Sequence, residues 1–274
     1  MPLRSLFLAI PKHHFNPRRT PASAQQSVMT ANASRQWCSA CTLARQLASP
    51  VELGIRSSVT HRSVPVARAP LPAWAIGPFE RPPESAAIVS PTFDSSFDCP
   101  MRGTPVRWEA LHTFNPAAIV RDGKVYLLYR AEDDFGEMAI SAHTSRLGLA
   151  VSDDGITFQR HPTPVVYPAD DSQKATEWDG GCEDPRLVEA PDGSYVLTYT
   201  QWDRRVPRLA IATSNDLHTW VKHGPAFKRV HGEKYHELHS KAGSIVCERT
   251  DDDRLVAVKV GGKYWMYWGE HTVR

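Results

Sequence analysis

One short stretch of the chain concentrates residue types that can do acid–base chemistry. Two carboxylates and a guanidinium stand within four residues, directly after two glycines, in the run Trp178-Asp179-Gly180-Gly181-Cys182-Glu183-Asp184-Pro185-Arg186. Glycine permits a tight backbone path and proline fixes φ, so these charges stand where the backbone is constrained. The pattern is typical of a site that points carboxylates at a ligand. An ion pair that only closes a turn is an equal alternative, because structural ion pairs also cluster.

The elements that would position this stretch are short strands. From about residue 105 the sequence consists of alternating apolar runs closed by Asp, Asn and Gly turns, which predicts an all-β fold. Three glycine-led strands begin at residues 123, 193 and 262, so they are 70 and 69 positions apart. A second series repeats at an offset of 62, where residues 147–158 match residues 209–220. A fixed period built from short strands indicates a β-propeller.

The number of repeats is small for such a fold. About three units fit between residue 105 and the last residue, Arg274, whereas a propeller of about 4–8 blades must close to remove its sheet edges. We therefore expect a partial propeller here and further blades beyond Arg274. The predicted organisation is a leader over residues 1–70, a linker and first propeller entry over 71–104, and a partial β-propeller catalytic domain over 105–274.

The leader differs in composition from the rest of the chain. It holds nine Lys and Arg, nine Ser and one acidic residue, Glu52, which is typical of an organelle transit peptide. An unstructured leader without function, or a misplaced start codon, is an equal alternative. Under either alternative we expect the leader to be disordered. The protein is expected in the cytoplasm or, if the leader is a transit peptide, in an organelle.

Overall charge and hydropathy argue against two classes of partner. The net charge of +2 gives no strong field to attract nucleic acid. No apolar run reaches the roughly 20 residues that span a bilayer, so no membrane partner is predicted.

Metal ligands are weakly indicated. Cys38 and Cys41 form a lone CxxC, with no second pair to complete a zinc site. His236 and His239 flank Glu237, but their spacing differs from that of a helical zinc motif. A solvated loop or a loop that lines a sugar cleft fits better, and neither a metal nor a cofactor is predicted.

From about residue 75 to residue 274 the sequence resembles glycoside hydrolase family 130, the β-mannoside phosphorylases and β-mannosidases. The resemblance rests on an ordered series of segments at residues 114–133, 145–155, 181–186, 198–200, 208–214, 240–241 and 262–264. It implies a five-bladed propeller with the active site in its central depression. It also places the general acid on Asp184, which in the family is thought to act through a sugar hydroxyl. Family members normally continue past the point where this sequence stops.

Each blade of a propeller contributes one or two residues to the central cleft. The expected substrate-binding residues are Asn115, Arg130, Glu132, Glu183, Arg186, Asp203 and Lys241. Arginine suits bidentate contacts, and Trp178 and Trp202 could stack on a pyranose ring, although packing within a blade explains them equally well.

Hydrolysis and phosphorolysis differ in the group that attacks the sugar. Family phosphorylases carry an arginine after the strand that corresponds to residues 262–268, but this chain has Glu270 there. A carboxylate repels phosphate and can activate water, so we expect inverting hydrolysis of a β-mannoside with Glu270 as the base. Lys241 keeps open the alternative, a phosphorylase that uses inorganic phosphate and releases mannose 1-phosphate. A second alternative is a non-catalytic carbohydrate-binding propeller fragment.

Overall fold

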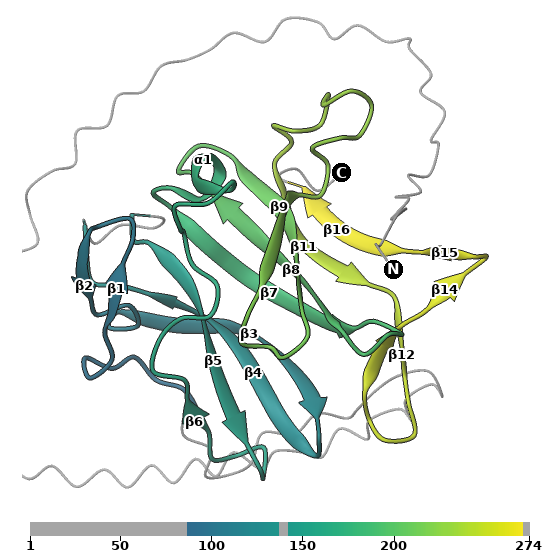
Figure 1. Ribbon diagram of the computed structural model, residues 1–274, viewed down its shortest axis with the longest axis horizontal. Coiled ribbons are helices and arrows are strands. Elements are labelled where there is room, and N and C mark those ends of the chain that lie inside the picture. The colour runs from purple at the N-terminus through teal and green to yellow at the C-terminus, as the bar shows by residue number, and fades with distance from the viewer. Residues whose placement is uncertain (1–86, 137–141, 271–274) are drawn as a thin grey trace, which may run out of the picture. The chain divides into compact units, whose positions relative to one another are not determined.

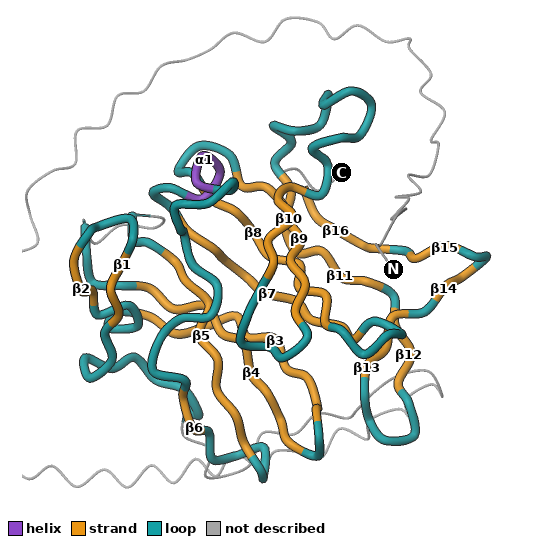
Figure 2. The backbone as a smooth tube through the Cα atoms, in the orientation of Figure 1, coloured by secondary structure: helices purple, strands orange, loops and turns teal. Residues whose placement is uncertain are grey.

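The computed structural model describes residues 87–136 and 142–270, with the side chain of Glu270 left out. The predicted leader therefore lies outside the described residues. The prediction of an all-β fold is confirmed, because a single four-residue helix, α1 (Lys174–Glu177), accompanies sixteen strands in the described part. Figure 2 shows the strands as the dominant elements. No helix in that part is long and apolar enough to cross a membrane.

Two four-stranded antiparallel units lie side by side (Figure 1). The first unit contains β3 (His112–Arg121), β4 (Lys124–Glu132), β5 (Ser145–Ser152) and β6 (Gln159–Arg160). The second unit contains β7 (Gly181–Glu189), β8 (Tyr195–Trp202), β9 (Pro207–Ser214) and β10 (Val221–Pro225). The two units share the same strand order, so the repeat predicted from the sequence is present in the pairing.

A third unit is started by β11 (Ser240–Ile245), which pairs with β16 (Met266–Glu270). Short hairpins surround these units, formed by β1 (Phe97–Cys99) with β2 (Thr104–Val106), β12 (Cys247–Arg249) with β13 (Leu255–Ala257), and β14 (Lys259–Val260) with β15 (Lys263–Tyr264). Within the described residues the three units do not close into a ring.

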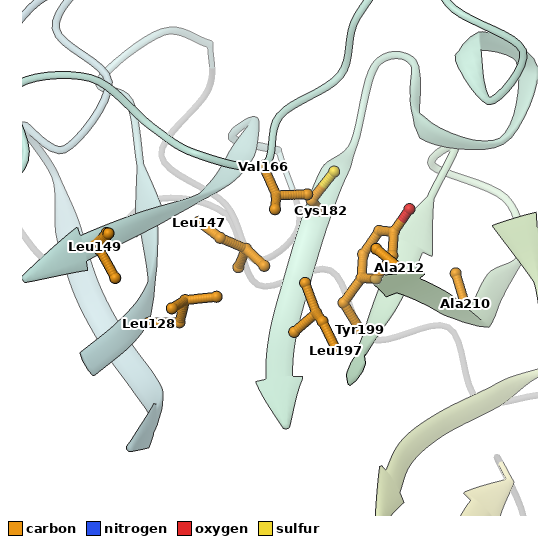
Figure 3. Close-up of a cluster of buried hydrophobic side chains, with 9 residues drawn as sticks. All are labelled: Leu128, Leu147, Leu149, Val166, Cys182, Leu197, Tyr199, Ala210 and Ala212. Carbon is orange, nitrogen blue, oxygen red and sulfur yellow. The ribbon is translucent and has the colours of Figure 1, made fainter. Parts of the chain in front are cut away.

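The core lies between the first and second units. Figure 3 shows the cluster of buried side chains that comes from both units and from the segment after β6: Leu128, Leu147, Leu149, Val166, Cys182, Leu197, Tyr199, Ala210 and Ala212. All of them are buried, and β5 is buried over nearly its whole length because it lies between β4 and the second unit. Burial of this apolar surface holds the units together at about 25 cal/mol per Å².

The same buried polar network recurs in the first two units. In the first, the carboxylate of Glu109 accepts hydrogen bonds from the Tyr129 hydroxyl at 2.8 Å and from Arg160 at 2.9 Å. In the second, Glu177 accepts from the Tyr199 hydroxyl at 2.9 Å and pairs with Lys222 at 2.6 Å. Each network joins the segment before the first strand of its unit to the second and fourth strands. A buried carboxylate therefore ties each unit together.

The aspartate turns that close the alternating apolar runs have a structural role. Asp154 accepts backbone hydrogen bonds from Ile156 and Thr157, and Asp216 accepts equivalent bonds from His218 and Thr219. These aspartates close the turns after β5 and β9.

Candidate active site

The first strands of the three units share one irregularity at the same register position. β3, β7 and β11 each slip in register against the neighbouring strand, and each slip contains a non-glycine residue with positive φ: Asn115 at 46°, Asp184 at 51° and Ala242 at 53°. Bulges of this kind re-aim side chains and are frequent beside active sites. The bulges bring together residues that are 69 and 58 positions apart in the sequence.

Asp184, which lies in the second unit, is held by groups from the first and third units. Its Oδ1 accepts a hydrogen bond from the Asn115 amide at 2.8 Å and forms an ion pair with Arg130 at 3.2 Å. Its Oδ2 lies 3.8 Å from Lys241 Nζ. The Asp184 side chain is 16% exposed, so solvent or a ligand can still reach it.

Arg130 is the hub of the cluster. Its guanidinium contacts Glu132 at 2.6 Å, Glu183 at 2.9 Å and Asp184 at 3.2 Å, and its Nε donates to the Ser145 hydroxyl at 3.0 Å. Only 10% of its side chain is exposed. A planar fork with several donors is the group best suited to hold several carboxylates at once.

Glu183 joins the second and third units. One carboxylate oxygen receives Arg130, and the other lies 3.0 Å from Lys241 Nζ. Glu183 is buried, whereas the Lys241 side chain is 44% exposed. Lys241 is therefore the more accessible cation of the cluster and can contact an incoming ligand.

The surrounding cations set the charge of the Asp184 carboxyl. Burial alone raises its pKa, but the hydrogen bond from Asn115 and the charges of Arg130 and Lys241 outweigh burial and leave the pKa below its usual value. The pKa of Glu132 is lowered in the same way, because Arg130 and His112 outweigh burial. Without a ligand, Asp184 is ionised at neutral pH.

We predict that Lys241→Met raises the pKa of Asp184, because the substitution removes a positive charge that favours the carboxylate. A ¹³C NMR titration of the aspartate carboxyls would measure the change. The matched control is Lys124→Met, since Lys124, at the start of β4, pairs with Asp153 in the turn after β5. An Asp184 pKa that stays the same or falls in Lys241→Met would contradict this electrostatic account.

His112 and Ser145 belong to the cluster, although sequence reasoning did not single them out. Ser145 is fully buried and donates to Glu132 at 3.1 Å. His112 Nδ1 lies 2.8 Å from the other Glu132 oxygen, and its side chain is half exposed. Both residues pair with Glu132 in the backbone register, so the hairpin pairing of β3, β4 and β5 was the signal that could have found them.

Gly180 and Gly181 stand where a side chain would clash with neighbouring atoms. A Cβ on Gly181 would lie 2.1 Å from the Ser145 carbonyl oxygen, and one on Gly180 would lie 2.1 Å from the Trp202 ring. Gly181 also has a φ of 116°, which side chains disfavour. The predicted tight backbone path thus brings β7 against the start of β5 and beside Arg130.

Two predicted substrate-binding residues have other partners in the structure. The exposed Arg186 donates to the carbonyl of Pro185 at 2.8 Å. Asp203 pairs with the buried Arg208 at 2.8 Å, which reproduces the pairing of Arg146 with Asp133 in the first unit. Among the described residues, no hydrogen bond or ion pair joins Arg186 or Asp203 to Asp184. Their role in substrate binding stays a prediction.

The tryptophans and the histidine loop make contacts of their own. Trp178 receives the Lys174 ammonium 4.1 Å from its ring centroid, and Trp202 packs on Gly180. His236 pairs with Glu237 at 2.8 Å. Across residues 87–136 and 142–270, no three His, Cys, Asp or Glu side chains gather as metal ligands would.

Glu270 lies at the end of β16, where its backbone pairs with Ser240. The neighbouring pair, Gly269 with Lys241, corresponds to Arg130 with Phe114 and to Thr200 with Glu183. Glu270 therefore holds the register position of Ala131 and Gln201. It stands one residue beyond the Lys241 pair, and its role as a base stays a prediction.

The sequence is similar to a known protein family and to proteins of known activity. The family model described as beta-1,4-mannooligosaccharide phosphorylase, glycoside hydrolase family 130, matches residues 82–274. Among curated proteins, a 1,2-beta-oligomannan phosphorylase of Thermoanaerobacter sp. (strain X514) is 34% identical over 162 residues, which cover 58% of this chain and 46% of that protein. A beta-1,2-mannobiose phosphorylase of the same strain is 29% identical over 171 residues, 58% of this chain and 48% of that protein.

Solved structures give a stronger likeness. One was reported with the finding that the GH130 family of mannoside phosphorylases contains glycoside hydrolases that target beta-1,2 mannosidic linkages in Candida mannan. It is 53% identical, with a TM-score of 0.70, and the match covers 73% of this chain and 55% of that one. A glycosyl hydrolase from Bacteroides ovatus is 52% identical, with the same TM-score and coverage. The chain thus spans about half the length of the relatives it matches.

Proposed function

The chain belongs to glycoside hydrolase family 130, and we propose that the protein cleaves β-mannosides at the cluster around Asp184. The observation that carries the proposal is the position of Asp184 in a left-handed bulge of the second unit, where Asn115 and Arg130 of the first unit and Lys241 of the third unit converge on its carboxylate. We propose also that these units are blades of a five-bladed propeller. The repeated networks of the first two units and the family resemblance support that fold.

The described cluster suits recognition of a sugar. Asp184 and Glu132 accept hydrogen bonds, while Asn115, Arg130 and Lys241 donate them, so the cluster matches the mixed donor and acceptor character of hydroxyls. Substrate hydroxyls that displace Lys241 and exclude water would raise the pKa of Asp184. That shift would let the carboxyl take up the proton that it passes, through a sugar hydroxyl, to the leaving oxygen.

The proposed attacking group is inorganic phosphate. The family model and the two Thermoanaerobacter relatives are described as phosphorylases, which supports phosphorolysis better than the hydrolysis favoured from Glu270 alone. An oxygen of phosphate would bond to the anomeric carbon as the glycosidic bond breaks, and the leaving oxygen would take the proton. The products would be mannose 1-phosphate and a saccharide shortened by one unit. Lys241, the accessible cation, is placed to draw the anion to the site.

Hydrolysis is the second candidate, and one observation favours it. The structure that is 53% identical was reported with the finding that the family contains hydrolases. In that reaction a water would attack the anomeric carbon, and a carboxylate such as Glu270 would take its proton. The product would be free mannose.

We expect product analysis to separate the two reactions. The protein is incubated with β-1,2- and β-1,4-linked mannobiose, with and without phosphate, and Asp184→Asn is the control for contaminating activity. Mannose 1-phosphate formed only when phosphate is present supports phosphorolysis. Free mannose formed without phosphate establishes hydrolysis instead. No cleavage of either β-mannoside would contradict the proposed function.

A further inference from the structure

The three bulges carry different residue types at one equivalent position. Phe114, Glu183 and Lys241 each hold the last paired position before the slip in register. The next residue is Asn115 in the first unit, Asp184 in the second and Ala242 in the third, and each has a φ near 50°. Two of the three bulges therefore present a polar side chain at this position, whereas the third presents only a methyl group.

Alanine is a poor choice for this backbone conformation. In the left-handed region a Cβ approaches the following carbonyl oxygen, so glycine is strongly favoured there, and asparagine and aspartate are several-fold enriched. The residues of the first two units follow this preference, and Ala242 does not. A strained residue that is kept in a bulge beside a reactive carboxylate suggests a functional requirement.

Both chain neighbours of Ala242 contact the second unit. The preceding residue, Lys241, points its Nζ to within 3.0 Å of Glu183 and 3.8 Å of Asp184 Oδ2. The following residue, Gly243, is fixed on the second unit, because its carbonyl accepts a hydrogen bond from Thr198 at 2.5 Å. Ala242 itself is exposed.

The pairing of the first two bulges indicates what a longer side chain at position 242 would do. Asn115 reaches across to Asp184 Oδ1 at 2.8 Å, from the bulge on one side. Ala242 occupies the equivalent bulge in the third unit, directly after Lys241, whose Nζ approaches Asp184 Oδ2. An amide at position 242 would extend toward Oδ2 and occupy the space between the second and third units.

We propose that Ala242 is a specificity-determining residue, kept small so that the mannosyl ring can enter beside Asp184 Oδ2. The inference deepens the proposed function and rests on it. Ala242 takes no part in proton transfer. It leaves Asp184 Oδ2 open to a sugar hydroxyl, at a cost in backbone strain that Asn or Gly would relieve.

The test compares variants that fill the space with one that does not. Ala242→Asn and Ala242→Asp place in the third bulge the side chains that the first and second bulges accept, whereas Ala242→Gly relieves strain and leaves the space open. The measurements are Tm, affinity for β-1,2-linked mannobiose, and kcat and KM. We expect the Gly and Asn variants to melt about 2–4 °C higher than the parent protein, as a gain typical of relieved backbone strain gives in a chain of this size.

Only the filling variants should lose affinity. A misplaced group of this size in a sugar pocket is expected to raise KM or the dissociation constant about 10–200-fold, whereas Ala242→Gly should bind like the parent. A purely structural role would not separate the Gly variant from the Asn variant in this way. The contrast between stability and binding in Ala242→Asn is therefore the decisive readout.

The possible failures are distinguishable. Binding by Ala242→Asn equal to that of an active parent would overturn the role of Ala242 and leave the proposed function intact. A parent that neither binds nor cleaves mannobiose would refute the proposed function, and the inference with it. Loss of folding in both filling variants would also overturn the inference, because it requires the third bulge to accept what the first two accept.

Discussion

Asp184→Asn is expected to lower kcat on a β-mannoside by about 10²–10⁴-fold, the usual contribution of a positioned general acid. The amide keeps the shape of the side chain but cannot pass on a proton. The hydrogen bond from Asn115 and the contacts of Arg130 can re-form around the remaining oxygen, so the fold should persist. Steady-state kinetics measure the loss, and far-UV circular dichroism checks the fold.

The matched control for this substitution is Asp192→Asn. Asp192 accepts hydrogen bonds from the backbone and hydroxyl of Ser194 in the exposed turn between β7 and β8, so it belongs to the same unit as Asp184. Its kcat should equal that of the parent protein. Full activity in Asp184→Asn, or an equal loss in both variants, would remove Asp184 from the mechanism.

Arg130→Met is expected to destabilise the fold by about 3–5 kcal/mol, the typical cost of removing one partner from a buried ion pair. Glu132 and Glu183 are buried, and each would lose a guanidinium contact shorter than 3 Å. Lys241 and His112 would remain as their charged or hydrogen-bonding neighbours. Urea denaturation of both proteins measures the difference in the free energy of unfolding.

Two comparisons separate charge from fork geometry and burial. Arg130→Lys keeps the charge but lacks the planar donors, so its stability should lie between those of Arg130→Met and the parent. Arg107→Met breaks the pair with Asp134, whose side chains are 53% and 31% exposed, and should cost about 0–1 kcal/mol. If Arg130→Met cost no more than Arg107→Met, Arg130 would not be the hub of the cluster.

The fold class could be predicted because its signals are local. Alternating apolar residues and aspartate turns can be recognised in segments of about ten residues, and their recurrence along the sequence indicates equivalent strands. The structure confirms the equivalence of β4 with β8 and of β5 with β9. The buried links from Glu109 to Tyr129 and from Glu177 to Tyr199 were not predicted, because each joins residues about twenty positions apart through tertiary packing.

Many residues of the cluster around Asp184 could also be predicted from the sequence. Asn115, Arg130, Glu183, Asp184 and Lys241 were named from the sequence, and the structure brings them together. His112 and Ser145 were missed because only the cross-strand register places them on Glu132. Composition alone did not show that Asp203 has a buried arginine partner, since that pairing depends on how one hairpin folds.

The third bulge shows a further limit of sequence reasoning. Asn115 and Asp184 each precede a proline, which marks an irregular point in the strand. Ala242 carries no such signal, because alanine is found in every regular element and its positive φ is visible only in the structure. The equivalence of the three positions emerges from strand register rather than from residue type.

The structure of Asp184→Asn in complex with β-1,2-linked mannobiose tests the central claim most directly. We expect a mannosyl ring beside residue 184, with a sugar hydroxyl within about 3.2 Å of its side chain, the ordinary limit of a hydrogen bond. We also expect contacts from Lys241 to the saccharide, in the space left by Ala242. A saccharide bound elsewhere, with Asn115, Arg130 and Lys241 still holding residue 184 and no sugar beside it, would contradict the assignment of this cluster as the active site.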